Sequence, residues 1–485
     1  MAPSLRRLAS DTVVYGVSTI LQRFLTFLLT PLYSNHLTPS ELGEVTAVFS
    51  VIAFVNIAYS LGMEPAFMRF HSNRNEGESS AAYANAVRTV VVLGSVMTLL
   101  TFVCAEQVAA SRFLALGAEG GRLVRWACFI PLFDALVLIP FARLRMQQRP
   151  KRFAVLRLVS VVANVILNVV LLTWFSLGVH GVILAGVISS LVVVLLMSPD
   201  ILQGLRTKAE VSVWRNMVRF GLPTVPASLS TILVQVADRP LLLMMAGSAT
   251  VGLFQTNFRL ALPMMMMVTV FEYAWKPFYL NHRDEDGASA LFARVLTLFT
   301  VACGCVFLLT ALLMPSVVAI PVGGGTFINE RYWQGLSVVP ITLLAFYLNG
   351  VFTNLAAGFH IAKRTGIFPI AMGLAAAINV IGTLVLVQPF GLDGAAWAKV
   401  AAYGASVAVL VVKLPSVYEI HYKWSHVAIA VVLAAAIYAA GLSLPRGWPV
   451  VAAGLVAPFL YVLLLMPLGV LNRSLLATIP RLIRR

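Results

Sequence analysis

The chain has 485 residues, of which 60% are hydrophobic and only 11% are charged. About a quarter of the residues of a soluble domain are charged, so this composition excludes an ordinary soluble fold. The formal net charge of +16 would suit a nucleic-acid-binding protein, so the placement of the bases along the chain has to decide between that class and a membrane protein.

Apolar stretches long enough to span a bilayer recur from residue 8 to residue 471. A transmembrane helix needs roughly 20 apolar residues, and we count fourteen such stretches. The sequence therefore predicts an all-α polytopic membrane protein with about 14 transmembrane helices. The expected spans are about 10–34, 42–69, 83–108, 122–143, 153–175, 181–203, 217–246, 250–278, 289–320, 334–361, 366–388, 392–413, 425–444 and 449–470.

Two turns between these spans are marked by local sequence. Thr38-Pro39-Ser40-Glu41 is expected to form an outer turn, because Ser and Glu favour the first turn of the helix that follows. Gly178-Val-His-Gly181 predicts a tight turn between the fifth and sixth spans.

The bases are divided unevenly between alternate loops. One set of loops holds 26 of the 35 Lys and Arg residues and four lie inside spans, whereas the other set holds only Arg112, Arg122, Arg125, Arg331 and Arg446. The positive-inside rule then places the basic loops and both termini in the cytoplasm, as an even number of spans requires. The basic surplus is thus a topology signal, and we expect no nucleic-acid partner.

Short motifs recur at half-chain distance. Glu64–Phe70 has a near copy at Glu272–Phe278, and both place a carboxylate, a bulky aromatic and a base at the end of an apolar stretch. Further pairs, at offsets of 209 to 213, are Pro31-Leu32 with Pro240-Leu241, Gly43 with Gly252, and Gly178-x-x-Gly181 with Gly391-x-x-Gly394. Six spans in each copy predict a parallel repeat about an axis along the membrane normal.

This repeat predicts the domain organisation. We expect an N-terminal lobe at 1–203, a cytoplasmic linker at 204–215, a C-terminal lobe at 216–423, and two extra helices with a basic cytoplasmic tail at 424–485. Parallel repeats of this kind enclose a central cavity, and rocking of the lobes exposes it to one side at a time. The architecture favours a carrier over a channel or a membrane enzyme.

Several motifs, in this order, resemble those of the polysaccharide flippases, which share a superfamily with the multidrug and toxin extruders and the lipid II flippases. The resemblance spans about residues 5 to 425. Its motifs are Tyr15, Arg23, Pro31-x-Tyr33, Leu42-Gly43, Gly62-Met-Glu64-x-Ala66-x-x-Arg69-Phe70, Asp238-Arg239-x-Leu241, Tyr273-Ala-Trp275-x-Pro277-Phe278, Lys363-Arg364-Thr365 and Gly391-x-x-Gly394-Ala395-Ala396.

The resemblance implies a carrier of the bacterial cytoplasmic membrane that turns undecaprenyl-diphosphate-linked oligosaccharide from the inner to the outer leaflet. The oligosaccharide would be a repeat unit of O-antigen, capsule or exopolysaccharide. The implied partners are this polyprenyl-diphosphate-linked oligosaccharide, membrane lipid, and the polysaccharide polymerase and assembly proteins.

Charged residues inside the spans are consistent with an anionic substrate. Arg23, Arg259 and Lys399 would each cost at least about 2.5–3.5 kcal/mol if they faced lipid, so each is expected to face a cavity or a partner. Guanidinium groups bind phosphate oxygens bidentately, so these residues and Arg239 are the predicted diphosphate site. The alternative is that they pair with neighbouring acids or with backbone carbonyls.

Asp238 and Asp134 are candidate acids, either for ion coupling or for structural pairing. Asp238 and Arg239 are adjacent, so they are expected to point to different sides of the helix.

Glu64 with Arg69, and Glu272 with Lys276, lie near the cytoplasmic ends of their spans. They are predicted either to form a cytoplasmic gate or merely to bond to nearby bases at helix ends.

No motif predicts catalysis, a cofactor or a metal. The seven histidines are scattered, Gly323-Gly-Gly325 lacks the Lys-Ser/Thr of a phosphate loop, and the four cysteines have no zinc spacing. We therefore expect a protein that is not an enzyme. The alternatives are a lipid II flippase, which also uses midplane arginines, and a cation-coupled multidrug extruder, which would need carboxylates in its cavity. An integral glycosyltransferase would need acidic residues in large outer loops, and the expected loops are short.

Overall fold

The computed structural model describes residues 16, 20–71, 76–117, 119–283, 285–445 and 447–471. These residues are almost entirely helical, and eleven of their helical segments are long and apolar enough to cross a membrane. Two of the eleven have 50 residues, or about 75 Å of straight helix, more than twice the hydrocarbon core of a bilayer. The segment Ile367–Ser416 is divided at Gly391 and supplies two crossings, whereas Val211–Leu260 is divided at Gly247 and supplies one crossing and the start of the next. The predicted all-α membrane fold is confirmed, with fourteen as an approximate number of spans.

Parts of the expected topology lie outside the described residues. They include Tyr15 and the bases Arg6, Arg7, Arg74, Arg446, Arg473, Arg481, Arg484 and Arg485.

The chain divides into two compact units, Met1–Gln255 and Thr256–Arg485. The first contains a helical stretch at 20–27, then α2 (Leu29–His36), α3 (Pro39–Ser60), α4 (Met63–His71), α5 (Glu76–Val103), α6 (Ala105–Ala109), α7 (Gly120–Ala127), α8 (Phe129–Met146), α9 (Pro150–Val169), η1 (Val170–Trp174), α10 (Gly178–Arg206), α11 (Val211–Gly221), η2 (Leu222–Thr224) and α12 (Val225–Val236). The unit boundary falls inside α13 (Asp238–Leu260), and the expected lobe division at 204–215 stays a prediction.

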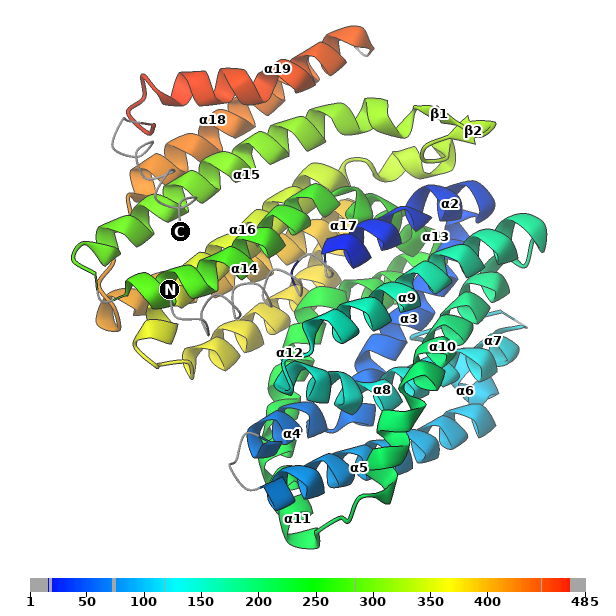
Figure 1. Cartoon of the computed structure of the whole chain (residues 1–485). Coiled ribbons are helices and arrows are strands. Elements are labelled where there is room, and N and C mark those ends of the chain that lie inside the picture. Colours follow the sequence, from blue (N-terminus) through cyan, green and yellow to red (C-terminus); the bar gives the residue numbers. More distant parts are fainter. Residues whose placement is uncertain are drawn as a thin grey trace. The chain divides into compact units, whose positions relative to one another are not determined.

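The second unit follows α13 with α14 (Leu262–His282), α15 (Ala288–Val318), β1 (Pro321–Val322), β2 (Gly325–Thr326), η3 (Glu330–Gly335), α16 (Val338–Ile361), α17 (Ile367–Lys413), η4 (Leu414–Ser416), α18 (Trp424–Leu442) and α19 (Trp448–Leu465). The strands pair antiparallel, so the Gly323–Gly325 run is a hairpin turn. The two C-terminal helices α18 and α19 pack along α15 (Figure 1) around the fully buried Tyr461.

The second span begins as expected but does not run as one helix. Thr38, rather than Ser40, caps α3 in a reciprocal capping box with Glu41. The helix ends at Leu61, whose φ of 44° is left-handed, and α4 begins after Gly62. A Cβ at Gly62 would lie 2.2 Å from the carbonyl oxygen of Gly221, so this break is also a point of close backbone approach.

The predicted turns between spans are confirmed at glycines with positive φ. The turn predicted at Gly178–Gly181 lies slightly earlier, at Ser176 and Gly178 with φ of 50° and 53°, and 178–181 form the first turn of α10. The repeat partner Gly391 breaks α17 with a φ of 56°. Gly247, with a φ of 81°, divides α13 in the same way. Only glycine adopts such angles without steric cost, so each position reverses the chain between two apolar helices.

The segment expected to link the lobes is held against the first unit. The Asn85 amide donates to the carbonyl oxygen of Glu210 at 2.8 Å, and the Arg88 guanidinium donates to the carbonyl of Leu205 at 2.8 Å. The Trp214 indole of α11 donates to the Thr89 hydroxyl of α5 at 3.0 Å. The connection between α10 and α11 is therefore fixed along α5.

Candidate functional site

Two repeat-related glycines bring the starts of two helices into backbone contact. A Cβ at Gly43, in the first turns of α3, would lie 1.8 Å from the carbonyl oxygen of Ser248. A Cβ at Gly252, just after the kink in α13, would lie 2.0 Å from the carbonyl oxygen of Pro39. Pro39 and Ser248 are 209 residues apart, as Gly43 and Gly252 are, so the contact is the same from both sides.

A hydrogen bond reinforces this glycine crossing. The hydroxyl oxygens of Ser40 and Ser248 lie 2.6 Å apart. Because neither glycine position has room for a side chain, the crossing holds only while these residues remain glycine. The predicted topology places it at the outer ends of the second and eighth spans.

The predicted diphosphate residues lie in different surroundings. Arg23, in the helical stretch at 20–27, and Arg259, near the end of α13, are both half-buried. Lys399 is only 3% exposed in α17, and its Nζ lies 4.7 Å from the ring centroid of Phe258. An ammonium enclosed in this way is stabilised by the ring quadrupole, so Lys399 is a buried cation of the second unit.

Asp238 and Arg239 pair with each other, contrary to the expectation that they point apart. Arg239 Nη1 lies 3.0 Å from Asp238 Oδ1, and its Nε donates to Gln255 Oε1 at 2.9 Å. The backbone stays helical at Ala237, so the pairing comes from the long Arg239 side chain, which folds back to the Asp238 carboxylate and to the carbonyl oxygen of Gln235. With Arg239 7% exposed and Asp238 fully buried, the pair ties the two arms of α13 together across Gly247.

Glu64 forms an ion pair inside its own unit. Its partner is Arg145 in the last turn of α8, one of the nearby bases expected for it, whereas Arg69 lies on the ring of Phe220 at 4.5 Å. The Glu64 and Arg145 side chains are 29% and 37% exposed. The pair therefore faces open space at the predicted cytoplasmic end of the unit.

The repeat copy at Glu272 has different surroundings. Glu272 and Lys276 are both exposed on α14, whereas Trp275 between them is buried and donates to the carbonyl oxygen of Asn354 at 3.3 Å. The sequence repeat is thus preserved, but Glu272 forms no ion pair among the described residues, and the gate remains a prediction for both motifs.

Asp134 lies on the face of α8 that also carries Arg145. Its Oδ1 accepts a hydrogen bond from the Ser190 hydroxyl of α10 at 2.9 Å. Asp134, Phe141 and Arg145 are spaced seven and four residues apart, so they share one face of α8. The guanidinium of Arg157, from α9, covers the ring of Phe141 at 4.3 Å.

Sequence reasoning missed Arg145 and Arg157 as functional candidates, because both were counted only as bases of the cytoplasmic loops. A signal was available for Arg157. It lies within the expected fifth span at 153–175, where a charge needs a partner or an aqueous face.

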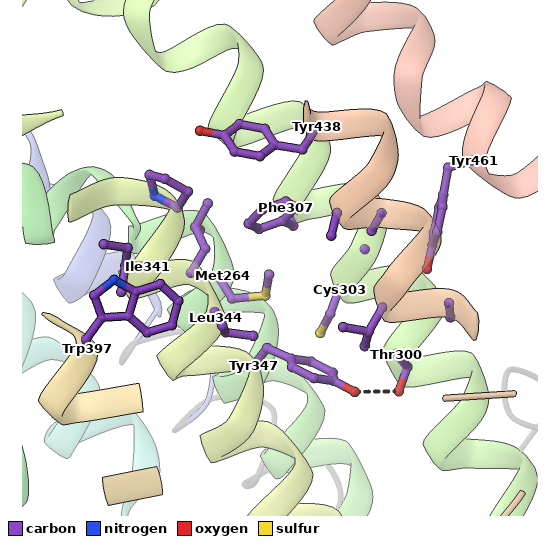
Figure 2. A pocket seen from close by; sticks show the side chains of 17 residues that line it. Met264, Thr300, Cys303, Phe307, Ile341, Leu344, Tyr347, Trp397, Tyr438 and Tyr461 are labelled. Atoms are coloured by element: carbon purple, nitrogen blue, oxygen red, sulfur yellow. Dashed lines mark hydrogen bonds between the residues drawn. The ribbon is translucent and has the colours of Figure 1, made fainter. Parts of the chain in front are cut away.

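An almost wholly apolar pocket of about 300 Å³ lies in the second unit. Figure 2 shows Met264 and Phe307 between Trp397 on one side and Tyr461 on the other. Its few polar groups include the Thr300 and Tyr347 hydroxyls, 3.1 Å apart. A site of this size and lining suits part of a hydrocarbon chain.

Within the described ranges, no cluster of His, Cys, Asp and Glu could hold a metal ion, and the four cysteines are free. The chemistry that these residues offer is charge pairing and apolar binding.

Comparison with known proteins gives a family and a fold. The family model described as "Polysaccharide biosynthesis protein" matches residues 36–324. No curated protein matches the chain. Among solved structures, the chain is similar to the lipid II flippase MurJ in an inward closed conformation, with a TM-score of 0.72 at 13% identity over 93% of this chain and 98% of that one.

It is also similar to an inward-facing multidrug resistance MATE family transporter of the MOP superfamily, with a TM-score of 0.64 at 15% identity over 84% of this chain and 98% of that one. An outward-facing MATE transporter gives 0.57 at 14% identity, over 83% and 94% of the two chains. At these identities the similarity concerns the fold.

Proposed function

Since the chain belongs to the family of polysaccharide biosynthesis proteins, whose model matches more than half of its length, we propose that it is a flippase for lipid-linked oligosaccharide. It carries polyprenyl-diphosphate-linked sugar from the inner to the outer leaflet of the cytoplasmic membrane, with both termini in the cytoplasm. The family match is the observation that carries this proposal. The fold shared with a lipid flippase and with multidrug transporters supports a carrier rather than an enzyme.

The charges and the pocket suit the two ends of such a substrate. Arg23 and Arg259 are half-buried cations in apolar helices, and Lys399 is a buried one, which fits an anionic diphosphate better than a cationic drug. The apolar pocket beside α18 suits part of the prenyl chain. Arg239 acts as a clamp for α13, because its Nε and Nη1 bond to Gln255 and Asp238 within the unit.

The glycine crossing of α3 and α13 is the outer seal of this carrier. A carrier must close one side before it opens the other, and a contact between helix starts, without side chains between them, can separate and re-form as a unit. A disulfide across it should therefore trap one state.

The flippase proposal is tested in proteoliposomes. The purified protein is reconstituted with fluorescent undecaprenyl-diphosphate-linked oligosaccharide, and the fraction accessible from one leaflet is followed with an impermeant quencher. We expect transfer with the oligosaccharide and none with a phospholipid bearing the same dye. Transfer of neither lipid would contradict the proposal.

A lipid II flippase is the second candidate, favoured by the similarity to MurJ over nearly the whole of both chains. A parallel assay with fluorescent lipid II separates the two, because a carrier selective for lipid II would leave the oligosaccharide in its original leaflet.

The seal is tested with the double substitution Ser40→Cys/Ser248→Cys, after the native Cys104, Cys128, Cys303 and Cys305 have been replaced. The hydroxyls lie 2.6 Å apart, so the introduced thiols are within reach of a disulfide. Oxidation should stop transfer, reduction should restore it, and the single variants should be unaffected. Full transfer by the oxidised double variant would show that the crossing does not open.

A further inference from the structure

The face of α8 carries two arginines that the predicted diphosphate site did not include. Arg145 and Arg157 converge on it from α8 and α9, at the predicted cytoplasmic end of the first unit. Each has unused donor capacity. Arg145 Nε is buried and has no hydrogen-bond partner among the described residues.

Arg157 is the more unusual of the two. In the part of the chain that the structure describes, its guanidinium has no hydrogen-bond acceptor and lies on the rings of Phe141 at 4.3 Å and Phe153 at 5.7 Å. It stands seven residues into α9 from Pro150, or about 10 Å along the helix. Asp134 and Glu64 offset its charge at a distance, but its donors remain without an acceptor among the described residues and can bind the oxygens of an anionic ligand.

Two carboxylates lie within electrostatic range of the arginines. Glu64 pairs with Arg145 near the end of α8. Asp134 lies about 16 Å from Arg145 along the same helix and accepts a hydrogen bond from Ser190. Arg157 lies within electrostatic range of Arg145, Glu64 and Asp134. The formal charges of these four side chains sum to zero.

We propose that Arg145 and Arg157 form a docking site for a diphosphate group, and that Glu64 occupies Arg145 until the diphosphate displaces it. The inference rests on the proposed function and adds the place where the charged group first binds. A diphosphate carries two phosphoryl groups, and each arginine presents a planar fork that matches one of them. Glu64 is then a competitor that releases Arg145, rather than a fixed structural partner.

This exchange predicts that substitutions of Arg145 and of Glu64 change the affinity for the diphosphate in opposite directions. Removing Arg145 removes a ligand contact, whereas removing the charge of Glu64 frees Arg145 for the ligand. A purely structural pair would instead lose function in the same direction from either side, because each change leaves a partly buried charge unpaired.

The test measures binding of geranylgeranyl diphosphate to the purified full-length protein in nanodiscs, by thermophoresis. Arg145→Gln and Arg157→Gln should each weaken binding about tenfold or more, since each loses charge-assisted hydrogen bonds. Glu64→Gln should strengthen it. Arg149→Gln, at an exposed base three residues after Met146, should stay within twofold of the wild type.

Geranylgeranyl monophosphate provides the second arm. It should bind more weakly than the diphosphate to the wild type, and Arg157→Gln should abolish this difference. Arg145→Lys, which keeps the charge but not the fork, should bind between wild type and Arg145→Gln. Melting temperatures identify any variant that fails to fold. If the Arg145 variants do not fold, binding by the Arg157 and Glu64 variants still tests the docking site.

Equal weakening by Arg145→Gln and Glu64→Gln, or wild-type binding by both arginine variants, would overturn the docking site. The proposed flippase function would survive that result if the wild type still transferred oligosaccharide. A wild type that transfers no oligosaccharide would contradict the function itself, whatever the arginine variants bind.

Discussion

Replacing Gly43 by alanine should open the outer seal without touching any charged group. The new Cβ would lie 1.8 Å from the carbonyl oxygen of Ser248, and that oxygen belongs to the backbone, which cannot rotate away. The two helix starts must therefore move apart by more than 1 Å. That movement stretches the 2.6 Å contact between Ser40 and Ser248 beyond hydrogen-bonding distance.

The destabilisation of the closed crossing is the sum of two effects, the overpacking and the lost hydrogen bond. Overpacking of this kind costs about 1–3 kcal/mol, and a lost hydrogen bond costs about 1 kcal/mol. The closed state should then be destabilised by about 2–4 kcal/mol, which shifts the closed-to-open ratio about 30- to 900-fold. Gly252→Ala should have an effect of similar size, because its Cβ would lie 2.0 Å from the carbonyl oxygen of Pro39.

The assay is the rate of disulfide formation in the Ser40→Cys/Ser248→Cys background without native cysteines. Gly43→Ala should slow cross-linking by at least tenfold. Gly373→Ala in α17 is the matched control, since a Cβ there meets no atom within 4 Å, and it should cross-link at the parent rate. Parent-like cross-linking in Gly43→Ala would refute the reasoning, because it would show that the helices accommodate a methyl group without separating.

Three further outcomes test other parts of the structure. Lys399→Met should lower oligosaccharide transfer at least tenfold, whereas Lys413→Met, at an exposed end of α17, should leave it unchanged. Full transfer by Lys399→Met would remove Lys399 from the substrate path. Tyr461→Phe should be neutral or stabilising by up to about 1 kcal/mol, since the buried hydroxyl has no hydrogen-bond partner among the described residues; a fall in melting temperature of several degrees would contradict this. Burial and the nearby charge of Arg143 lower the pKa of His71, so the unfolded chain takes up a proton at a higher pH than the folded chain does. The free energy of unfolding should therefore decrease as the pH falls below the usual histidine pKa of about 6.5. Thermal unfolding of His71→Gln at pH 7.5 and 5.5 should show a smaller pH dependence than the wild type.

The fold could be predicted from the sequence wherever the signal was local. Apolar stretches of membrane-spanning length, and the turn glycines Gly178 and Gly391, gave helices and reversals where the structure has them. The break at Leu61 could not be predicted in the same way. Leucine has no local preference for a left-handed conformation, and the close approach of Gly62 to Gly221 depends on packing with a distant helix.

The candidate site was harder to predict because its contacts are far apart in sequence. Glu64 and Arg145 are 81 residues apart, and only the packing of α4 on α8 brings them together. The repeat was misleading here, since Glu272 keeps the sequence position of Glu64 but not its partner. Asp238 and Arg239 show the opposite error. Helical spacing directs adjacent side chains apart at Cβ, but the long Arg239 side chain still reaches the carboxylate of Asp238.

The glycine crossing also bears on the origin of the chain. Two positions 209 residues apart make the same contact with each other's helix, which is the isologous interface of a symmetric dimer. In a homodimer of half-length subunits, a single glycine codon would have specified both sides of the seal. After fusion of the two copies, a change at either position is enough to break the contact, so the duplicated gene is exposed to twice as many damaging mutations at this point. We therefore expect Gly43 and Gly252 to resist the divergence that separated Glu272 from Glu64.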